Sequence, residues 1–169
     1  DDGTMARRDD LDKFGEKYNL HTVYISDIVE YRLQYESLIE LVGTKEIELF
    51  GNRFKKITFK DHQGNFHYAL LNHIETTTNV KFYPIEDNVK FIDKFDDYIK
   101  TLNYIEKNGG IILFMHNDKN YDKQKEFGIG AQILKHLGIE KLHLISKSGK
   151  NEFFGLKGFG IEILDNIKV

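Results

Sequence analysis

The residues best suited to chemistry form a polar loop that follows a short apolar run. Leu142 to Ser146 has the length of a β-strand, and the chain continues as Ser-Lys-Ser-Gly-Lys, which ends at Lys150. In α/β domains a ligand commonly binds where a strand ends in such a loop. The same pattern is also typical of a solvated surface loop, and spacing alone does not separate the two interpretations.

Histidines provide a second set of candidate ligands. His62, His67 and His73 lie in a segment that reads as a β-hairpin. The two-residue period of a strand would place His67 and His73 on one face, where Glu75 could join them around a metal ion. This spacing matches no established zinc signature, and isolated histidines in strands are usually structural or exposed. We therefore expect no native metal site here.

The composition limits the remaining chemistry. The chain has 169 residues, is 40% hydrophobic, and carries 24 basic and 27 acidic residues that are interspersed along it. The sequence shows no basic stripe for nucleic acid, no apolar run of membrane-spanning length and no signal-peptide pattern. We therefore expect a soluble, cytoplasmic protein with a real core. The absence of cysteine excludes disulfides, thiolate–metal sites and cysteine nucleophiles.

The elements that must position these groups begin with a helix–strand–helix pattern. Asp9 or Asp10 can cap a helix whose apolar residues fall on one face. Leu20–Ile25 reads as a strand, and Ser26 as the N-cap of a second helix. Ser37–Gly51 is predicted to hold the end of that helix, a turn at Gly43 and a connecting strand.

The remainder is predicted to be an α/β domain with a mixed β-sheet flanked by helices. Its strands are expected at 54–60 and 66–74, joined by a hairpin turn, and at 80–83, 111–115, 142–146 and from 161 onward. Pro84, the only proline, is expected to end the third strand. One amphipathic helix is expected between Asp93, its predicted cap, and Asn108-Gly109-Gly110. Another is expected to run through Phe127 and Leu134 and to end at Gly138.

Two segments carry a resemblance to a known family. The chain reads G-I-G-A-Q-I-L-K-H-L-G-I-E-K-L-H-L-I-S from Gly128 and G-L-K-G-F-G-I-E-I from Gly155. Phe127–Val169 resembles the C-terminal half of GTP cyclohydrolase II, which opens the purine ring of GTP in riboflavin synthesis. The hairpin also fits the pattern of that family, with Phe54, Phe59, Asp61 and the run His67-Tyr68-Ala69-Leu70.

The N-terminal segment resembles a different family. D-D-G-T-M-A-R at the start and S-D-I-V-E-Y-R from Ser26 are similar to the last part of 3,4-dihydroxy-2-butanone 4-phosphate synthase, which acts on ribulose 5-phosphate. The two families are commonly fused in this order. The resemblance implies that residues 1–39 are the tail of a synthase domain and that residues 40–169 form a GTP cyclohydrolase II-like domain. The Mg²⁺ ligands of the synthase belong to earlier motifs, so Mg²⁺ is expected only in the intact synthase domain.

The resemblance also indicates which chemistry is missing. The cyclohydrolase family holds a catalytic Zn²⁺ with three cysteines, and the corresponding interval Glu75–Lys94 contains none, so zinc is predicted absent. The stretch that contacts purine and phosphate is deleted between Met115 and Phe127. Alignment places Lys123 at the position of the proton-accepting Asp, which reverses the charge. It places Lys125 at the position of the Arg, which loses the bidentate guanidinium.

We therefore expect no catalytic residue and no metal in residues 40–169. Ser146 replaces a Thr of the family, and either Lys150 or Asn151 falls at a GTP-contacting Lys, so Ser146 and Lys150 are expected to be a nucleotide-binding remnant. The domain is predicted to serve stability, dimerisation or regulation in a homodimer, by analogy with the two families. Two alternatives remain open. One is an active GTP cyclohydrolase II with an unorthodox site, and the other is a sensor of GTP or a flavin-pathway ligand.

Overall fold

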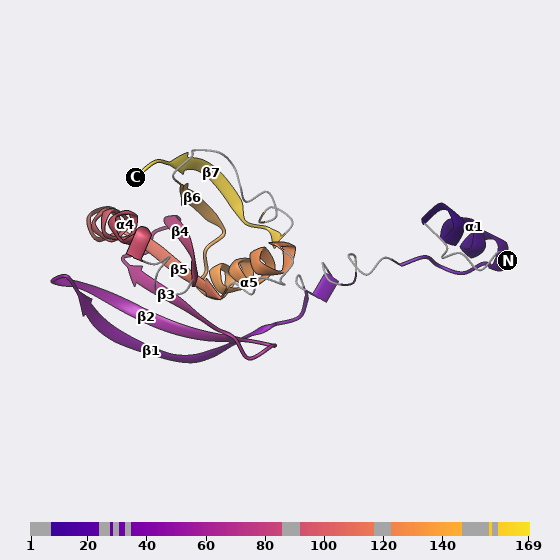
Figure 1. The fold of residues 1–169 in the computed structure, drawn as a ribbon, viewed down its shortest axis with the longest axis horizontal. Helices are drawn as coiled ribbons and strands as arrows, with labels where there is room; N and C mark the ends of the chain where they lie inside the picture. The colour runs from indigo at the N-terminus through magenta and orange to yellow at the C-terminus, as the bar shows by residue number, and fades with distance from the viewer. Residues whose placement is uncertain are drawn as a thin grey trace.

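A seven-stranded mixed β-sheet forms the body of the molecule (Figure 1). The structure, a computed structural model, describes residues 8–23, 28, 31–32, 35–85, 92–116, 123–146, 156 and 159–169, with only the backbone for residues 8 and 123–127. The strands are β1 (Ile39–Leu49), β2 (Asn52–Asp61), β3 (Phe66–Asn72), β4 (Thr77–Ile85), β5 (Gly110–His116), β6 (Lys141–Ile145) and β7 (Glu162–Ile167). The helices are α1 (Arg8–Tyr18), α4 (Phe95–Asn108) and α5 (Lys123–His136).

The sheet joins an antiparallel half to a parallel half. The strand order is β1-β2-β3-β5-β4-β6-β7. The pairs β1–β2, β2–β3 and β3–β5 are antiparallel. The pairs β5–β4, β4–β6 and β6–β7 are parallel. The prediction of a mixed sheet is therefore confirmed. Because β4, β5 and β6 are parallel, their carboxyl ends meet at one edge of the sheet.

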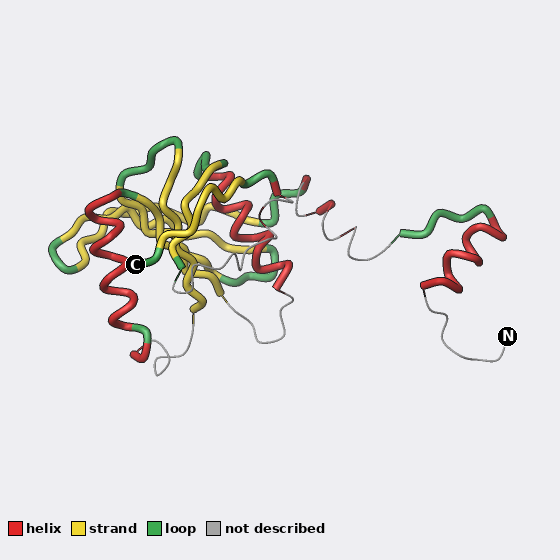
Figure 2. The backbone as a smooth tube through the Cα atoms, turned by 90° about the horizontal axis from the view of Figure 1, so that it is seen from above, coloured by secondary structure: helices red, strands yellow, loops and turns green. Residues whose placement is uncertain are grey.

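The helices α4 and α5 cover opposite faces of the sheet (Figure 2). Helix α5 buries Ile133 and Leu134 in the larger core, together with Ile111 from β5. Helix α4 buries Leu102 and Ile105 in the second core, which also includes Phe54, Leu70, Ile112 and Ile145. Successive residues of β5 thus enter opposite cores, which confirms the prediction of a strand buried on both faces. Each of these side chains contributes about 1.5–3 kcal/mol through burial.

The ends of the two helices are set by glycines. The N–H of Gly109, at φ 72°, donates to Ile105 O (2.8 Å) and ends α4. Gly138, at φ 76°, ends α5, where the N–H of Ile139 donates to Leu134 O (2.9 Å). Both predicted helix ends are confirmed. The predicted cap Asp93 is wrong, since Lys94 is the N-cap and makes no side-chain capping bond.

One predicted turn and one predicted strand end lie inside continuous strands in the structure. β1 passes through Gly43, where the pairing with β2 shifts register between Leu41 and Gly43, so this glycine marks a bulge and not a turn. Pro84 lies inside β4 rather than ending it. The last pair between β4 and β6 is Val80–Leu144, so the missing N–H of Pro84 interrupts no bond on that side.

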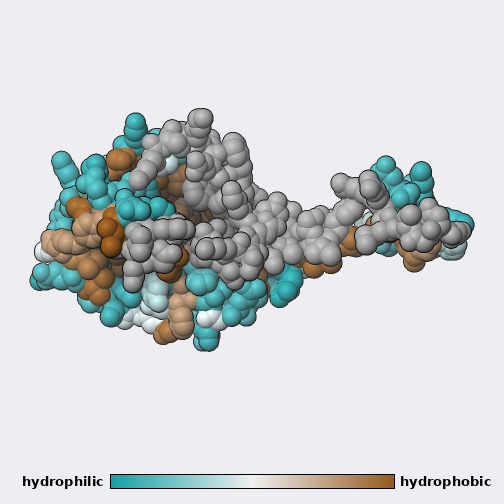
Figure 3. Space-filling view, viewed as in Figure 1, coloured by the Kyte–Doolittle hydropathy of each residue, from teal (hydrophilic) through white to brown (hydrophobic). Residues whose placement is uncertain are grey.

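The N-terminal part lies apart from the sheet (Figure 1). The apolar residues of α1, Leu11, Phe14 and Tyr18, are all about half exposed. Hydrophobic residues accordingly appear on the surface of this part (Figure 3). The predicted strand Leu20–Ile25 is wrong for residues 20–23, which have no strand pairing, and residues 24–25 lie outside the described part. Ser26 also lies outside it, and residues 28, 31, 32 and 35 are helical.

None of the helices in the described part of the chain is long and apolar enough to cross a membrane.

Candidate functional site

The candidate ligand edge is the one where the parallel strands end. β5 ends at His116, β4 at Ile85 and β6 at Ile145. The backbone N–H of Ser146, which follows β6, donates to Ile167 O (2.9 Å). The predicted remnant loop is therefore anchored to β7 at its first residue. Lys150 lies outside the described residues.

The two positions that the sequence predicts to be degenerate lie at the beginning of α5. Lys123 is the first residue of that helix, and Lys125 is in its first turn. The structure describes the backbone of both residues and not their side chains. The first turn of a helix favours negative charge, so two lysines there oppose the helix dipole.

His67 and Asp61 form a buried pair at the turn between β2 and β3. His67 is 3% exposed, and its Nε2 lies 3.1 Å from Asp61 Oδ2. The other ring nitrogen, Nδ1, accepts a hydrogen bond from the backbone N–H of His116 (3.2 Å). Because a backbone N–H can only donate, Nδ1 carries a lone pair and Nε2 carries the hydrogen. Both nitrogens are occupied, so His67 has no position left for a metal.

The pKa values of this pair follow from its burial. Desolvation lowers the pKa of His67 and outweighs the opposing effect of Asp61, so the ring is neutral at pH 7. Burial alone would raise the pKa of Asp61, but hydrogen bonds from Asn65, His67 and Gln63 outweigh it and lower that pKa. The pair is therefore a neutral imidazole donating to a carboxylate.

The histidines weighed as possible metal ligands are not brought together. His73 follows the end of β3 and does not share a face of that strand with His67. The two are six residues apart along an extended chain, or about 20 Å. His73 and Glu75 do form an exposed ion pair (3.5 Å). Within the described ranges, no three His, Cys, Asp or Glu side chains are grouped so that they could hold a metal ion.

A buried polar network that the sequence did not indicate links β4 to α4. The hydroxyl of Tyr83 donates to Asp97 Oδ2 (2.8 Å) and lies 2.9 Å from Thr101 Oγ1. Lys81 Nζ is 3.9 Å from the same carboxylate oxygen, and both side chains are largely buried. Burial raises the pKa of Tyr83, and the hydrogen bond to Asp97 adds to this effect. The one available signal was Lys81, a charged residue among the apolar and aromatic residues in the second half of β4.

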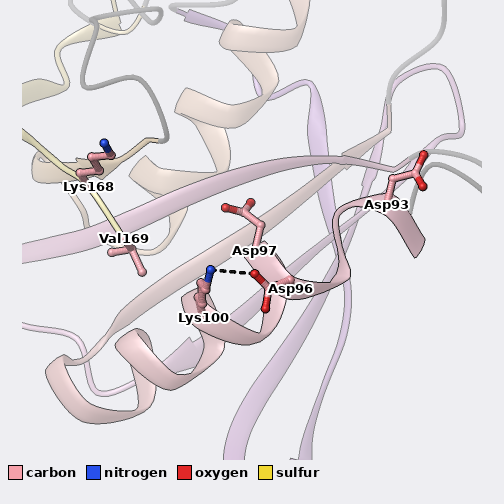
Figure 4. Close-up of a pocket in the computed structure, with 6 residues that line it drawn as sticks. All are labelled: Asp93, Asp96, Asp97, Lys100, Lys168 and Val169. Atoms are coloured by element: carbon pink, nitrogen blue, oxygen red, sulfur yellow. Dashed lines mark ion pairs between the residues drawn. The ribbon is translucent and has the colours of Figure 1, made fainter.

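Two cavities lie beside these elements. The first, of about 290 Å³, borders the first turn of α4 and the end of β7 (Figure 4). Its lining includes Asp93, Asp96 and Asp97. Lys100 Nζ lies 2.7 Å from Asp96 Oδ2 and compensates the charge of that carboxylate. The second, of about 380 Å³, borders the amino ends of β4 and β5 and includes the His73–Glu75 pair. Both cavities are wide and polar, which differs from the apolar, enclosed form of most small-molecule sites.

Comparison with known proteins connects the chain to two families. The sequence model of the family GTP cyclohydrolase II matches residues 115–168. A 3,4-dihydroxy-2-butanone 4-phosphate synthase of Sulfurospirillum multivorans is 43% identical over 174 residues, which cover 100% of this chain and 49% of that protein. The synthase of Campylobacter jejuni is 39% identical over 96% of this chain and 49% of its own length. The chain thus spans about half the length of the curated relatives it matches.

A solved structure supports the same connection. The crystal structure of a two-domain 3,4-dihydroxy-2-butanone 4-phosphate synthase from A. baumannii matches with a TM-score of 0.70 and 27% identity. The match covers 100% of this chain and 51% of that one. The mixed α/β fold is therefore shared with part of a synthase structure. These similarities agree with both resemblances in the sequence.

Proposed function

We propose that the chain is the C-terminal part of a riboflavin-biosynthesis protein whose intact form makes 3,4-dihydroxy-2-butanone 4-phosphate from ribulose 5-phosphate. In this proposal, residues 40–169 are a GTP cyclohydrolase II-like domain that has lost catalysis. Residues 1–39 are the tail of the synthase domain, which also holds the Mg²⁺ of the intact protein.

One observation carries this proposal. The relatives align with the whole chain, including its sheet domain, and they are named for the synthase reaction. The cyclohydrolase model, by contrast, matches residues 115–168 only. A domain that still performed the cyclohydrolase reaction would need its zinc ligands, which in that family precede this stretch.

The residues that remain support the loss of chemistry. The chain contains no cysteine. His67, the one buried histidine near the carboxyl end of β5, has both nitrogens hydrogen-bonded. Lys123 and Lys125 replace an acid and an arginine of the family, so the groups assigned to proton transfer and phosphorus attack have no counterpart there.

The exposed apolar residues of the N-terminal part support the proposed boundary. β1, the first strand of the sheet, begins at Ile39. In the part of the chain before it, the apolar side chains of Leu11, Phe14 and Tyr18 in α1 are about half exposed to solvent. An amphipathic helix of this kind gains its stability by burying its apolar face. The relatives are about twice as long as this chain, and their remaining half is the partner we propose for that face.

Two other functions stay as alternatives for the sheet domain. An active GTP cyclohydrolase II would need an unorthodox metal site. A regulatory module would bind GTP or a flavin-pathway product at Ser146 and Lys150. The observation that favours it is the hydrogen bond that anchors Ser146 to β7, at the edge where the parallel strands end. We also propose a homodimer, by analogy with the two families.

Zinc content and ligand-induced stabilisation separate these functions. The proposed non-catalytic domain is expected to retain no stoichiometric zinc after dialysis against a zinc-containing buffer. About one zinc per chain would contradict it in favour of the enzyme. GTP at 100 times its dissociation constant would stabilise a sensor by about 2.7 kcal/mol, seen as a rise in Tm. That rise should disappear in Lys150→Ala and persist in Lys168→Ala, a lysine outside the loop.

A further inference from the structure

The turn between β2 and β3 is hydrogen-bonded to two distant parts of the chain. On one side, the N–H of His62 donates to Leu38 O (3.0 Å), just before β1. On the other side, Nδ1 of His67 accepts the N–H of His116 (3.2 Å), the last residue of β5. The turn therefore contacts both the place where the N-terminal part enters the sheet and the place where β5 leaves it.

Gln132 of α5 holds the same entry segment from the opposite side. Its Oε1 accepts the N–H of Leu38 (2.8 Å), and its Nε2 donates to Glu36 O (2.8 Å). Both backbone groups of Leu38 are thus bonded, its N–H to α5 and its carbonyl to the turn. Leu38 also packs against the core that α5 covers. This segment is a fixed junction rather than a free linker.

Asp61 holds the turn between β2 and β3 together through its side-chain hydrogen bonds, and so links His62, which contacts Leu38, to His67, which contacts His116. Its Oδ1 accepts the N–H groups of Gln63 and Asn65 (2.9 Å each), and its Oδ2 accepts Nε2 of His67 (3.1 Å). The Asp61 side chain is almost fully buried. Buried hydrogen bonds of this kind strengthen one another and are costly to leave unmade.

We propose that Gln132, the Asp61 turn and His67 form a coupling device between the junction at Leu38 and the end of β5 at His116. Gln132 and His67 are positioning residues in this device. The chain of hydrogen bonds from Gln132 to His116 is contiguous and can carry coupling, which the exchange experiment below tests directly. Loosening the junction releases the turn, and the turn then releases the end of the strand that leads to α5.

His67 makes the device sensitive to acid. A proton added to Nδ1 replaces the acceptor by a donor that faces the N–H of His116, so that hydrogen bond is lost. The titratable groups around the ring are Asp61 from β2 and His116 from β5, while α5 contributes His136, which packs edge-on against the neighbouring Phe59 (5.3 Å). The carboxylate of Asp61 keeps its bond to the protonated ring. Acid therefore acts first at the end of β5.

Residue-resolved amide hydrogen exchange of the 169-residue chain tests the coupling. Gln132→Met keeps the side-chain length and removes both bonds, and His67→Phe keeps the ring and removes both nitrogens. We expect Gln132→Met to speed exchange of the Leu38 amide roughly fivefold to tenfold. This is the change in the opening equilibrium that follows from the loss of one hydrogen bond of ordinary net strength. Exchange of the His116 amide should accelerate in the same variant, and His67→Phe should in turn accelerate Leu38. Lys135→Met, on the exposed side of α5, should change neither amide.

The two possible outcomes are distinct. Acceleration of both amides by either variant supports the coupling, whereas a change confined to the amide nearest each substitution overturns it. If His67→Phe does not fold, the unmodified chain is compared between pH 7.5 and pH 5.5 after correction for intrinsic exchange. Greater opening at both His116 and Leu38 at the lower pH supports the proposal. Unchanged opening at Leu38 contradicts it.

Discussion

The hydroxyl of Tyr83 in β4 donates a hydrogen bond to the carboxylate of Asp97 in α4 at 2.8 Å. This contact lies in the second core, where Tyr83 also stacks on Phe114 with ring centroids 5.8 Å apart. Lys81 Nζ lies 3.9 Å from the same carboxylate oxygen. The polar network thus fixes α4 against the sheet in one orientation.

Tyr83→Phe should destabilise the domain, because it removes a hydroxyl that Asp97 needs as a donor in a buried site. The expected loss in the free energy of unfolding is about 1–3 kcal/mol, measured by urea denaturation. Tyr68→Phe is the matched control, since its ring is partly exposed on β3, and it should change the free energy by less than about 0.5 kcal/mol. Equal losses in both variants would contradict the role given to this network.

The stability of the chain should fall as the pH drops below the ordinary His pKa of 6.5. The pKa of His67 is lowered in the folded state, so the unfolded chain takes up the proton first. This contribution is therefore fully present above pH 6.5 and is lost as the pH falls through the lowered pKa. Urea denaturation from pH 8 to pH 5 should show a shallower decline for His67→Phe than for the unmodified chain. Parallel curves would mean that His67 does not titrate differently in the two states.

Gly110→Ala should be strongly destabilising. A Cβ at this position would lie 2.4 Å from the carbonyl oxygen of Asn79, and the backbone has φ 137°. Because the obstructing atom belongs to the backbone of β4, the start of β5 would have to move, at a cost of at least about 2 kcal/mol. Gly43→Ala is the control, since nothing lies within 4 Å of its Cβ position, and its Tm should stay close to that of the unmodified chain.

Leu113→Ala tests the larger core. This residue of β5 is fully buried between the sheet and α5, so its truncation should cost about 2–5 kcal/mol. Leu164→Ala removes the same atoms from a half-exposed position in β7 and should cost less than about 1 kcal/mol. Comparable losses in denaturation would indicate that β5 is not the centre of the core.

The sequence predicted those elements whose signals are local. The continuous apolar run at Ile111–Met115 favoured a strand buried on both faces, and Gly138 could end a helix because glycine adopts a positive φ without cost. Gly43 misled the prediction because a glycine in a strand marks a bulge as readily as a turn. Of the strand predicted at Leu20–Ile25, the described residues 20–23 pair with no other strand in the described part of the chain.

The site was harder to predict because its contacts join residues far apart in the chain. His67 was considered as a metal ligand, and its hydrogen bond to the N–H of His116 depends on the pairing of β3 with β5. The contact of Tyr83 with Asp97 requires the packing of α4 on the sheet. Gln132 lay in a motif shared with the cyclohydrolase family, and only the fold places it against Leu38.

The most direct test of the central claim is GTP turnover by this chain with Zn²⁺ and Mg²⁺ supplied, followed through formate or the diaminopyrimidine product. Circular dichroism of the same sample establishes that the protein is folded. The account predicts a rate equal to that of a protein-free control. Turnover above that control, lost on chelation and restored by zinc, would contradict the account and identify residues 40–169 as an active cyclohydrolase.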